Sequence, residues 1–332
     1  MLGTSHRKSA VRKLVQEMQE GLRTYFQLPS DYEVVLGNGG ATLLWDMIGL
    51  GLVKKKSYHF VCGEFSDKWC RAHKNIPWLA PEARKVDFGH GLNPEAVEGF
   101  DLIACTLNET STGVMLTDLP STDEHTLLAI DATSGAGQIP IDFKKSDFYY
   151  FSPQKVFASE GGLYVAIFSP KARARAEEIA RLESRFIPES LKWSHALENS
   201  RQNQTYNTPS IATIFFLNEQ VKLMNQLGEK MVAELAAKKA ELIYNWAESK
   251  SYLNPFVQER RFRSTAVATI DVDERFSADD LAMSLRKSGL VYDIDSYRKL
   301  GRNQFRIALF HNVSLENLEK LTRIISLAIE GA

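Results

Sequence analysis

The sequence has few cysteines, and their spacing argues against two common ways of stabilising a chain. Cys62, Cys70 and Cys105 are the only ones among 332 residues. Their odd number and the lack of a CxxC pair argue against a disulfide framework and against a zinc site. We therefore expect no metal, and a reducing, cytoplasmic setting fits best.

The sequence also has no long apolar run and no marked excess of either charge. No stretch is long enough to span a bilayer, and the first residues lack the apolar region of a signal peptide. A net charge of −1 gives no sign of a nucleic-acid or acidic-membrane partner. With 332 residues, 44% of them hydrophobic, the chain can form one large domain or two unequal ones.

Up to residue 210, short β-rich runs alternate with stretches of helical periodicity. Strands are expected at 33–36, 58–62, 101–106, 126–130, 148–151 and 163–168, and helices at 8–26, 41–52 and 66–74. Several of the strands lack polar alternation, which is typical of a mainly parallel sheet covered on both faces. Residues 1–210 are thus predicted to form a large α/β domain.

After Pro209 the pattern changes. Residues 211–250 have the composition of one long connecting helix, with Gly228 as a candidate break. Residues 251–332 predict a small α+β domain, with strands at 265–272, 291–294 and 305–310 and helices at 277–288 and 314–329. A functional site is expected between the two domains.

The sharpest chemical signal is Lys155, in Phe151-Ser-Pro-Gln-Lys155 at the end of an apolar strand, with Gly161 and Gly162 soon after it. A buried ammonium is costly unless it is paired or neutralised. A lysine whose pKa is lowered by burial can condense with an aldehyde, which is a form of covalent catalysis. For a lone lysine, a charged group that reaches out to solvent is the more common explanation.

Asp131 strengthens the signal of Lys155. It follows the strand 126–130, at the edge where open α/β sheets bind ligands. A carboxylate there can pair with the pyridinium nitrogen of pyridoxal phosphate (PLP) and keep the ring an electron sink. Alone, Asp131 is better explained as a turn or helix-capping aspartate. Together with Lys155, it indicates a PLP site.

Two further features suit such a site. Gly37-Asn-Gly-Gly-Ala-Thr42 lies between a strand and a helix, where backbone N–H groups and a helix N-terminus favour a phosphate. It matches neither GxxxxGK[ST] nor GxGxxG, and a plain tight turn explains it equally well. Phe65 can stack on the pyridine ring, although such a residue is more often part of the core.

Together these segments resemble the fold-type I PLP enzymes, specifically the class V aminotransferases and their phosphoserine aminotransferase branch of the actinobacterial kind. The resemblance covers nearly the whole chain and is carried by Gly3-Thr-Ser-His-Arg7, Gly37-Asn-Gly-Gly-Ala-Thr42, Gly63-Glu-Phe-Ser66, Asn108-Glu-Thr-Ser-Thr-Gly113, Ile130-Asp-Ala-Thr-Ser-Gly-Ala-Gly137, Pro153-Gln-Lys155, Asn203-Gln-Thr-Tyr-Asn-Thr-Pro209 and Tyr297-Arg-Lys-Leu-Gly-Arg-Asn-Gln304.

The resemblance implies the fold and the cofactor contacts. The fold is that of PLP-dependent transferases of type I: a large domain with a mainly parallel seven-stranded sheet plus a small C-terminal α+β domain. The family's segment before the Ser-His-Arg motif is expected to be missing here. The resemblance implies Lys155 as the Schiff-base lysine and Asp131 as the pyridinium partner, with Gln154 and Thr110 as further contacts. It implies that Gly40, Ala41 and Thr42 surround the phosphate and that Phe65 stacks on the ring, where many relatives carry Trp. It also implies a homodimer, in which Asn207 and Thr208 reach the PLP phosphate of the neighbouring subunit.

The substrate side is expected to carry cations, because a phosphorylated keto acid brings a phosphate and a carboxylate, and arginine suits both. The resemblance implies His6 and Arg7 at the anion site, with Arg7 also serving glutamate, and Arg306 at the α-carboxylate. Arg298, Lys299 and Arg302 form a basic cluster that adds phosphate contacts or, equally well, a solvated charged loop.

The implied reaction transfers an amino group from L-glutamate to 3-phosphohydroxypyruvate, giving O-phospho-L-serine and 2-oxoglutarate, in serine biosynthesis. The related 4-phosphohydroxythreonine of pyridoxine biosynthesis fits the same anion site. Two alternatives remain open from the sequence. One is another class V enzyme, such as a serine–glyoxylate aminotransferase or a cysteine desulfurase. The other is a non-catalytic α/β protein that binds a phosphorylated metabolite.

Overall fold

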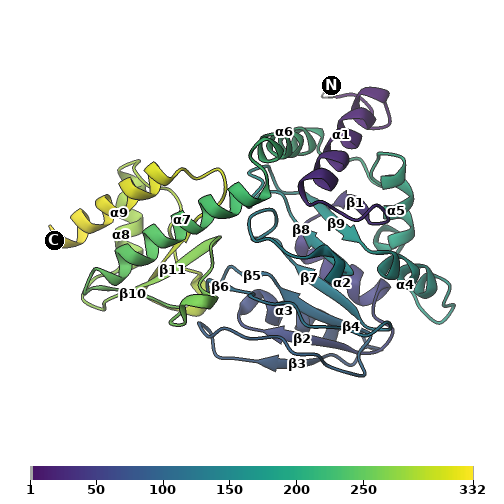
Figure 1. The fold of residues 1–332 in the computed structure, drawn as a ribbon, viewed down its shortest axis with the longest axis horizontal. Helices are drawn as coiled ribbons and strands as arrows, with labels where there is room; N and C mark the ends of the chain where they lie inside the picture. Colours follow the sequence, from purple (N-terminus) through teal and green to yellow (C-terminus); the bar gives the residue numbers. More distant parts are fainter. Residues whose placement is uncertain (1–2, 332) are drawn as a thin grey trace.

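The computed structural model describes residues 3–331 and contains one large sheet with helices on both faces (Figure 1). The sheet has seven strands in the order β1-β9-β8-β7-β4-β2-β3. Their bounds are β1 Glu33–Asn38, β2 Ser57–Val61, β3 Glu82–Lys85, β4 Leu102–Thr106, β7 Leu127–Asp131, β8 Phe148–Phe151 and β9 Leu163–Phe168. Only β9 runs against the other six, since it is antiparallel to both β1 and β8 while the remaining pairs are parallel. This confirms the predicted fold class.

Successive side chains of the central strands enter two separate cores. In β8, for example, Tyr149 and Phe151 face one core while Phe148 and Tyr150 face the other, as the two-residue period of a strand requires. The first core is closed by α1 (Ser9–Tyr25) and α6 (Ile211–Leu227). The second is closed by α2 (Ala41–Gly51), α3 (Glu64–Lys74), α4 (Pro170–Ala180) and α5 (Trp193–Arg201). Burial on both faces explains why these strands have no polar alternation.

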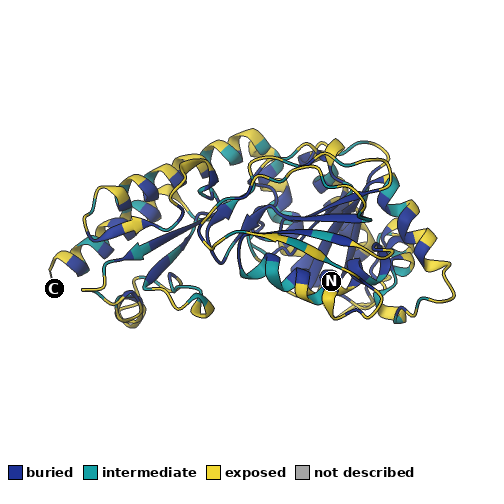
Figure 2. Cartoon of the chain, turned by 90° about the horizontal axis from the view of Figure 1, so that it is seen from below, coloured by how far each residue is buried: buried dark blue, intermediate teal, exposed yellow. Residues whose placement is uncertain are grey.

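The C-terminal part forms a smaller unit at one end of the molecule (Figure 1). Its antiparallel sheet contains β10 (Leu253–Pro255), β11 (Val267–Val272) and β12 (Gln304–Ala308). It packs with α7 (Glu229–Glu248), α8 (Ala278–Lys287) and α9 (Leu315–Glu330) around a third core, and Figure 2 shows the buried strands between helices with exposed outer faces. Short elements complete the fold: β5 (Asn108–Glu109) with β6 (Val114–Met115), and 3₁₀ turns at Phe143–Lys145, Glu189–Leu191, Arg260–Phe262 and Arg298–Leu300.

Two expected elements differ from the structure. Residues 211–250 contain two helices, α6 and α7, which separate at Gly228, whose φ is +80°. The first packs on α1 and the second belongs to the small domain, so the glycine lets the chain change direction. The strand expected at 291–294 is absent, since the segment's one backbone hydrogen bond to β12 runs from the N–H of Arg306 to Ile294. Across the described part of the chain, no helix is long and apolar enough to cross a membrane.

A close contact joins the two domains at Gly91. This residue lies in the loop between β3 and β4, against the ring of Phe262 from the segment before β11. Phe262 is 1% exposed and packs with Cys62, Val114 and Val257. A Cβ at position 91 would lie 1.9 Å from the Phe262 ring, so this backbone approach requires glycine.

We expect Gly91→Ala to destabilise the protein by about 1–3 kcal/mol, because overpacking forces buried groups out of their preferred positions. Urea unfolding followed by circular dichroism measures the change. Gly161→Ala is the matched control, because a Cβ at position 161 would meet no atom within 4 Å and the φ of Gly161 is not positive. Equal unfolding midpoints for the two variants would contradict the assigned contact.

Candidate active site

The carboxyl ends of the parallel strands meet at one edge of the sheet, and the predicted cofactor residues gather there. Asp131 ends β7, and Lys155 lies in the turn that follows β8. The segment of Thr110 follows β4, that of Phe65 follows β2, and the glycine loop follows β1. Side chains from five separate stretches of sequence therefore share one edge, which is where open α/β sheets bind ligands.

Asp131 is a buried carboxylate without a cation. It is 5% exposed and accepts hydrogen bonds from Trp45 Nε1 at 3.2 Å, from the N–H of Thr133 at 3.0 Å and from Thr133 Oγ1 at 2.5 Å. No lysine, arginine or histidine within residues 3–331 forms an ion pair with it. Burial raises its pKa, against the effect of these hydrogen bonds. A protonated ring nitrogen would supply the missing positive charge, so the residue fits the pyridinium of PLP.

Lys155 is half-buried, and no hydrogen bond or ion pair of its ammonium is found within the described chain. Burial lowers its pKa, the nearby charge of Arg306 lowers it further, and Asp293 acts in the opposite direction. More of this lysine is therefore present as the neutral amine than for an exposed lysine. A free, partly neutral amine is what condensation with an aldehyde requires.

The glycine loop ends in a helix N-terminus that is open to an anion. Gly40 caps α2 without a side-chain bond, and the N–H groups of Gly40 and Thr42 have no acceptor among residues 3–331. The N–H of Ala41 donates to Ser152 Oγ at 2.8 Å, which ties the helix start to the end of β8. Gly39, with φ +117°, donates to the carbonyl of Gly162 at 3.1 Å. Unpaired N–H groups at a helix start suit a phosphate.

Phe65 lies in the first turn of α3, and a residue that the sequence did not reveal holds this turn in place. Glu109 is fully buried and accepts hydrogen bonds from the N–H of Phe65 at 3.2 Å and of Ser66 at 2.9 Å. Ser111 Oγ donates to the same carboxylate at 2.6 Å. A Cβ at Gly63 would lie 2.3 Å from Glu109, so this approach also depends on glycine. The carboxylate of Glu109 caps α3 although it lies 43 positions after Ser66 in the sequence, so no local pattern could predict this contact.

Thr110 and Gln154 lie at the rim of this edge. Thr110 Oγ1 donates to Ser134 Oγ at 2.7 Å, and Ser134 Oγ in turn donates to the carbonyl of Asn108 at 3.1 Å. Ser134 is a further residue that sequence reasoning missed. Gln154 is exposed, one residue before Lys155. Both stay predicted cofactor contacts.

Arg306 brings the small domain to the site. It lies on β12, acts on the charge of Lys155, and forms no ion pair within the described residues. Of the basic cluster, Arg298 is exposed, and Lys299 pairs with Glu64 at 3.6 Å. Arg302 makes two hydrogen bonds to Asp271, at 3.0 and 2.6 Å, so the small domain's own carboxylate already engages it.

His6 and Arg7 lie beside the loop that carries Asn207 and Thr208. His6 is 8% exposed, contacts the backbone of Thr205, and its Nε2 has no partner among the described residues. Burial and then the charge of Arg7 lower its pKa. Arg7, Asn207 and Thr208 are exposed, and Asn38 Nδ2 donates to the carbonyl of Thr208 at 2.6 Å. The loop thus adjoins the glycine loop, while contact of these four residues with a ligand stays a prediction.

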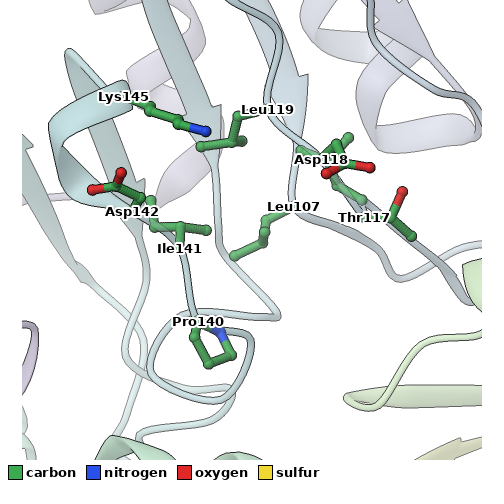
Figure 3. Close-up of a pocket in the computed structure, with 9 residues that line it drawn as sticks. Leu107, Thr117, Asp118, Leu119, Pro140, Ile141, Asp142 and Lys145 are labelled. Carbon is green, nitrogen blue, oxygen red and sulfur yellow. The ribbon is translucent and has the colours of Figure 1, made fainter.

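A separate hollow, shown in Figure 3, takes no part in this arrangement. Asp142 and Lys145 lie on one side of it and Asp118 on the other, with Leu107, Pro140 and Ile141 between them. None of the predicted cofactor or substrate residues lines it. We assign it no chemistry.

Comparisons with known proteins agree with the geometry. The sequence profile of the family described as "Aminotransferase class-V" matches residues 90–293. The chain is 48% identical over 335 aligned residues to a phosphoserine aminotransferase of Corynebacterium glutamicum, covering 100% of this chain and 88% of that protein. A phosphoserine aminotransferase of a Nocardioides species is 44% identical, with 99% and 89% covered. The crystal structure of a phosphoserine aminotransferase from Cytophaga hutchinsonii matches with a TM-score of 0.91 at 26% identity, covering 98% of this chain and 91% of that one.

The chain belongs to the class V aminotransferases. Within that family it groups by sequence identity with the phosphoserine aminotransferases, as the sequence motifs predicted. PLP is the cofactor of class V aminotransferases, and the residues at the sheet edge fit it. An unpaired buried acid, an unpaired amine and an open helix N-terminus share this edge, and their chemistry suits a ring nitrogen, an aldehyde and a phosphate, respectively.

We expect borohydride reduction of the PLP-treated protein to leave the cofactor covalently attached at Lys155, and Lys155→Ala to abolish this adduct. The lowered pKa of Lys155 leaves a larger share of its amine unprotonated, and so reactive, than in an exposed lysine. Peptide mass spectrometry locates the adduct. Lys239 is the internal control: burial lowers its pKa to about 8, but it donates to the carbonyls of Leu309, Phe310 and His311. An adduct that persists in Lys155→Ala would rule out the assignment.

We expect Asp131→Asn to separate cofactor binding from folding. The substitution removes a buried charge that no cation balances, so the unfolding free energy of the cofactor-free protein should change by less than about 1 kcal/mol. PLP affinity should fall by about tenfold or more, because the ring nitrogen loses its charged partner. Thermal unfolding and a spectrophotometric PLP titration measure the two effects. Unchanged affinity would show that Asp131 is only a turn residue.

Proposed function

We propose that this class V aminotransferase transfers the amino group of L-glutamate to 3-phosphohydroxypyruvate, giving O-phospho-L-serine and 2-oxoglutarate. The observation that carries the proposal is the identity of 48% over the whole chain to a protein named phosphoserine aminotransferase. The arrangement of Lys155, Asp131 and Arg306 supports the proposal. It combines a free amine, an unpaired acid and an unpaired guanidinium near the carboxyl edge of the sheet. Serine biosynthesis is the corresponding role.

Each side chain at the sheet edge has its own role toward the cofactor. PLP, when bound, supplies an electron-accepting ring that stabilises negative charge at the substrate α-carbon. Asp131 keeps the ring nitrogen protonated, and Phe65 covers the ring. Gly40, Ala41 and Thr42 hold the phosphate through backbone N–H groups and the α2 N-terminus. Gln154 and Thr110 add further contacts to the cofactor.

Lys155 and Arg306 act on the substrate. Lys155 Nζ accepts the proton of the α-carbon as a general base and later returns a proton as a general acid. Its lowered pKa suits this role, since the neutral amine is the base. Arg306 binds the α-carboxylate that glutamate and the keto acid have in common, through its planar fork of donors. One arginine thereby orients both substrates.

The phosphate of the substrate needs further cations. We assign it to the exposed cations Arg7, Arg298 and Lys299, together with the buried His6, whose lowered pKa favours a neutral imidazole and whose Nε2 has no partner among the described residues. Arg302 takes no part in this assignment, because Asp271 holds it. The same cations would accept 4-phosphohydroxythreonine, which carries the same phosphate. The three cysteines are free and buried, which favours a reducing, cytoplasmic setting.

We also propose a homodimer in which Asn207 and Thr208 reach the partner's cofactor phosphate. An unpartnered apolar stripe on α6 and the start of α7, close to this loop, supports it. Its side chains are 43–49% exposed: Phe215, Phe216, Leu223, Leu227 and Met231. Exposed aromatic and aliphatic groups gathered along α6 and the first turn of α7 favour association.

Activity with different substrates tests the proposed reaction. With glutamate and 3-phosphohydroxypyruvate the protein should turn over, whereas alanine with glyoxylate should give little product. Arg306→Lys should lower kcat/KM by about 10- to 100-fold, because a point charge replaces a bidentate fork. Arg275→Lys is the control, since Arg275 is exposed and pairs with Asp273 on the outer surface. Preference for alanine and glyoxylate would contradict the proposal.

Light scattering during size exclusion tests the dimer. Phe216→Glu combined with Leu223→Glu should convert the protein to a monomer and lower its activity, because charge is buried in the proposed interface. Leu327→Glu is the control, because Leu327 is 72% exposed on α9, away from the stripe. A wild-type monomer with full activity would refute the shared site.

A further inference from the structure

Tyr297 lies where the small domain meets the first turn of α3, and its side chain is held from several directions. Its hydroxyl accepts a hydrogen bond from Lys68 Nζ at 2.9 Å. Its ring centroid lies 5.4 Å from that of Phe65, with the planes at 52°. The guanidinium of Arg306 lies 5.8 Å from the same ring. One tyrosine therefore touches the residue assigned to cover the cofactor ring and the residue assigned to the substrate carboxylate.

Lys68 is placed to hold this tyrosine rather than to reach solvent. It comes one helical turn after Glu64, whose carboxylate lies 3.5 Å from its ammonium. The ammonium lies 5.1 Å from the Phe65 ring centroid and 5.7 Å from that of Tyr297, within the range of cation–π attraction. Burial opposes the charge, but the hydrogen bond to Tyr297 and the carboxylate of Glu64 outweigh it, so the pKa of Lys68 is raised. The lysine stays charged where the two domains meet.

The first turn of α3 and the segment that carries Tyr297 differ in how firmly their backbones are held in place. The first turn of α3 is fixed by the buried carboxylate of Glu109. The segment that carries Tyr297 belongs to no sheet and meets β12 through the bond from Arg306 to Ile294. Arg286 of α8 also holds this segment, through the carbonyl of Tyr292 and an ion pair with Asp295, and the side chain of Tyr297 adds the contacts with α3. Lys299, two residues on, adds an ion pair with Glu64.

We propose that Tyr297 is a positioning residue of the site, which, when held by Lys68, sets Arg306 and Phe65 relative to each other. We call Phe65, Lys68, Tyr297 and Arg306 the clasp. The clasp joins the cofactor-covering residue of the large domain to the carboxylate-binding residue of the small domain. The inference rests on the proposed function, because it uses the assignment of Arg306 to the substrate carboxylate.

Tyr297→Phe tests the clasp, because phenylalanine keeps the ring and its contacts with Phe65 and Arg306 but loses the hydroxyl. We expect KM for glutamate to rise about 5- to 10-fold, as for the loss of a hydrogen bond to a charged group, with kcat changed less than about twofold. Lys68→Met should raise KM at least as much, because it removes the same bond together with the contacts of the ammonium with Glu64 and the two rings. The double variant should be no worse than Lys68→Met alone, because without Lys68 the Tyr297 hydroxyl has no bond left to lose.

A second measurement needs neither cofactor nor turnover. In the cofactor-free protein, amide hydrogen exchange of residues 295–301 should be faster in Tyr297→Phe and in Lys68→Met than in the wild type. Two matched variants should match the wild type in both measurements. Tyr292→Phe removes a hydroxyl in the same segment from a side chain that is 71% exposed, and Lys74→Met removes an exposed charge at the other end of α3.

The outcomes separate the clasp from the proposed function. Unchanged KM and unchanged exchange in Tyr297→Phe would overturn the clasp while leaving the aminotransferase intact. Additive losses in the double variant would also overturn it, because the two side chains would then act independently. If the wild type turned over no phosphorylated substrate, the proposed function would fail. Faster exchange in the two clasp variants alone would then still support the contact.

Discussion

The site depends on one electrostatic constraint, the burial of the Asp131 carboxylate without a positive partner. The carboxylate is held by Trp45 and Thr133, so its position is fixed before any ligand arrives. Burial of an unpaired charge is unfavourable, and the raised pKa of the group expresses that cost. A cationic ring nitrogen at this place would remove the cost, and under the proposed function part of the affinity for the cofactor comes from this unsatisfied charge.

The same edge of the sheet holds two helix starts by the same means. Ser152 accepts a bond from the first turn of α2, and Glu109 accepts two from the first turn of α3. In both cases a side chain beyond a strand end satisfies N–H groups that a helix leaves unpaired. The α2 start still has free N–H groups for a phosphate, whereas Glu109 occupies those of α3. The start of α2 is thereby left open to an anion, whereas the start of α3, which carries Phe65, is held in place by Glu109.

The sequence allowed the prediction of features that follow from strand ends and periodicity. Asp131 ends one recognisable apolar strand and Lys155 follows the end of the next, and the carboxyl ends of parallel strands converge, so their place at one edge followed from the fold class. The strand expected at 291–294 is wrong because an apolar run does not reveal its pairing: Ile294 is buried, but Tyr292 is 71% exposed. The bond between Lys68 and Tyr297 joins residues 229 positions apart, and no local pattern could predict it.

The two domains contribute different parts of the proposed site. The groups proposed to hold the cofactor ring and its aldehyde come from the large domain, where they follow the ends of its strands. Arg306 comes from β12 of the small domain, yet its charge acts on Lys155. Any shift of the small domain thus changes the effect of Arg306 on the pKa of Lys155 and, under the proposed function, the geometry of carboxylate binding as well. Contacts that hold the two domains in register, such as Gly91 against Phe262, therefore also help to keep Arg306 in place relative to Lys155.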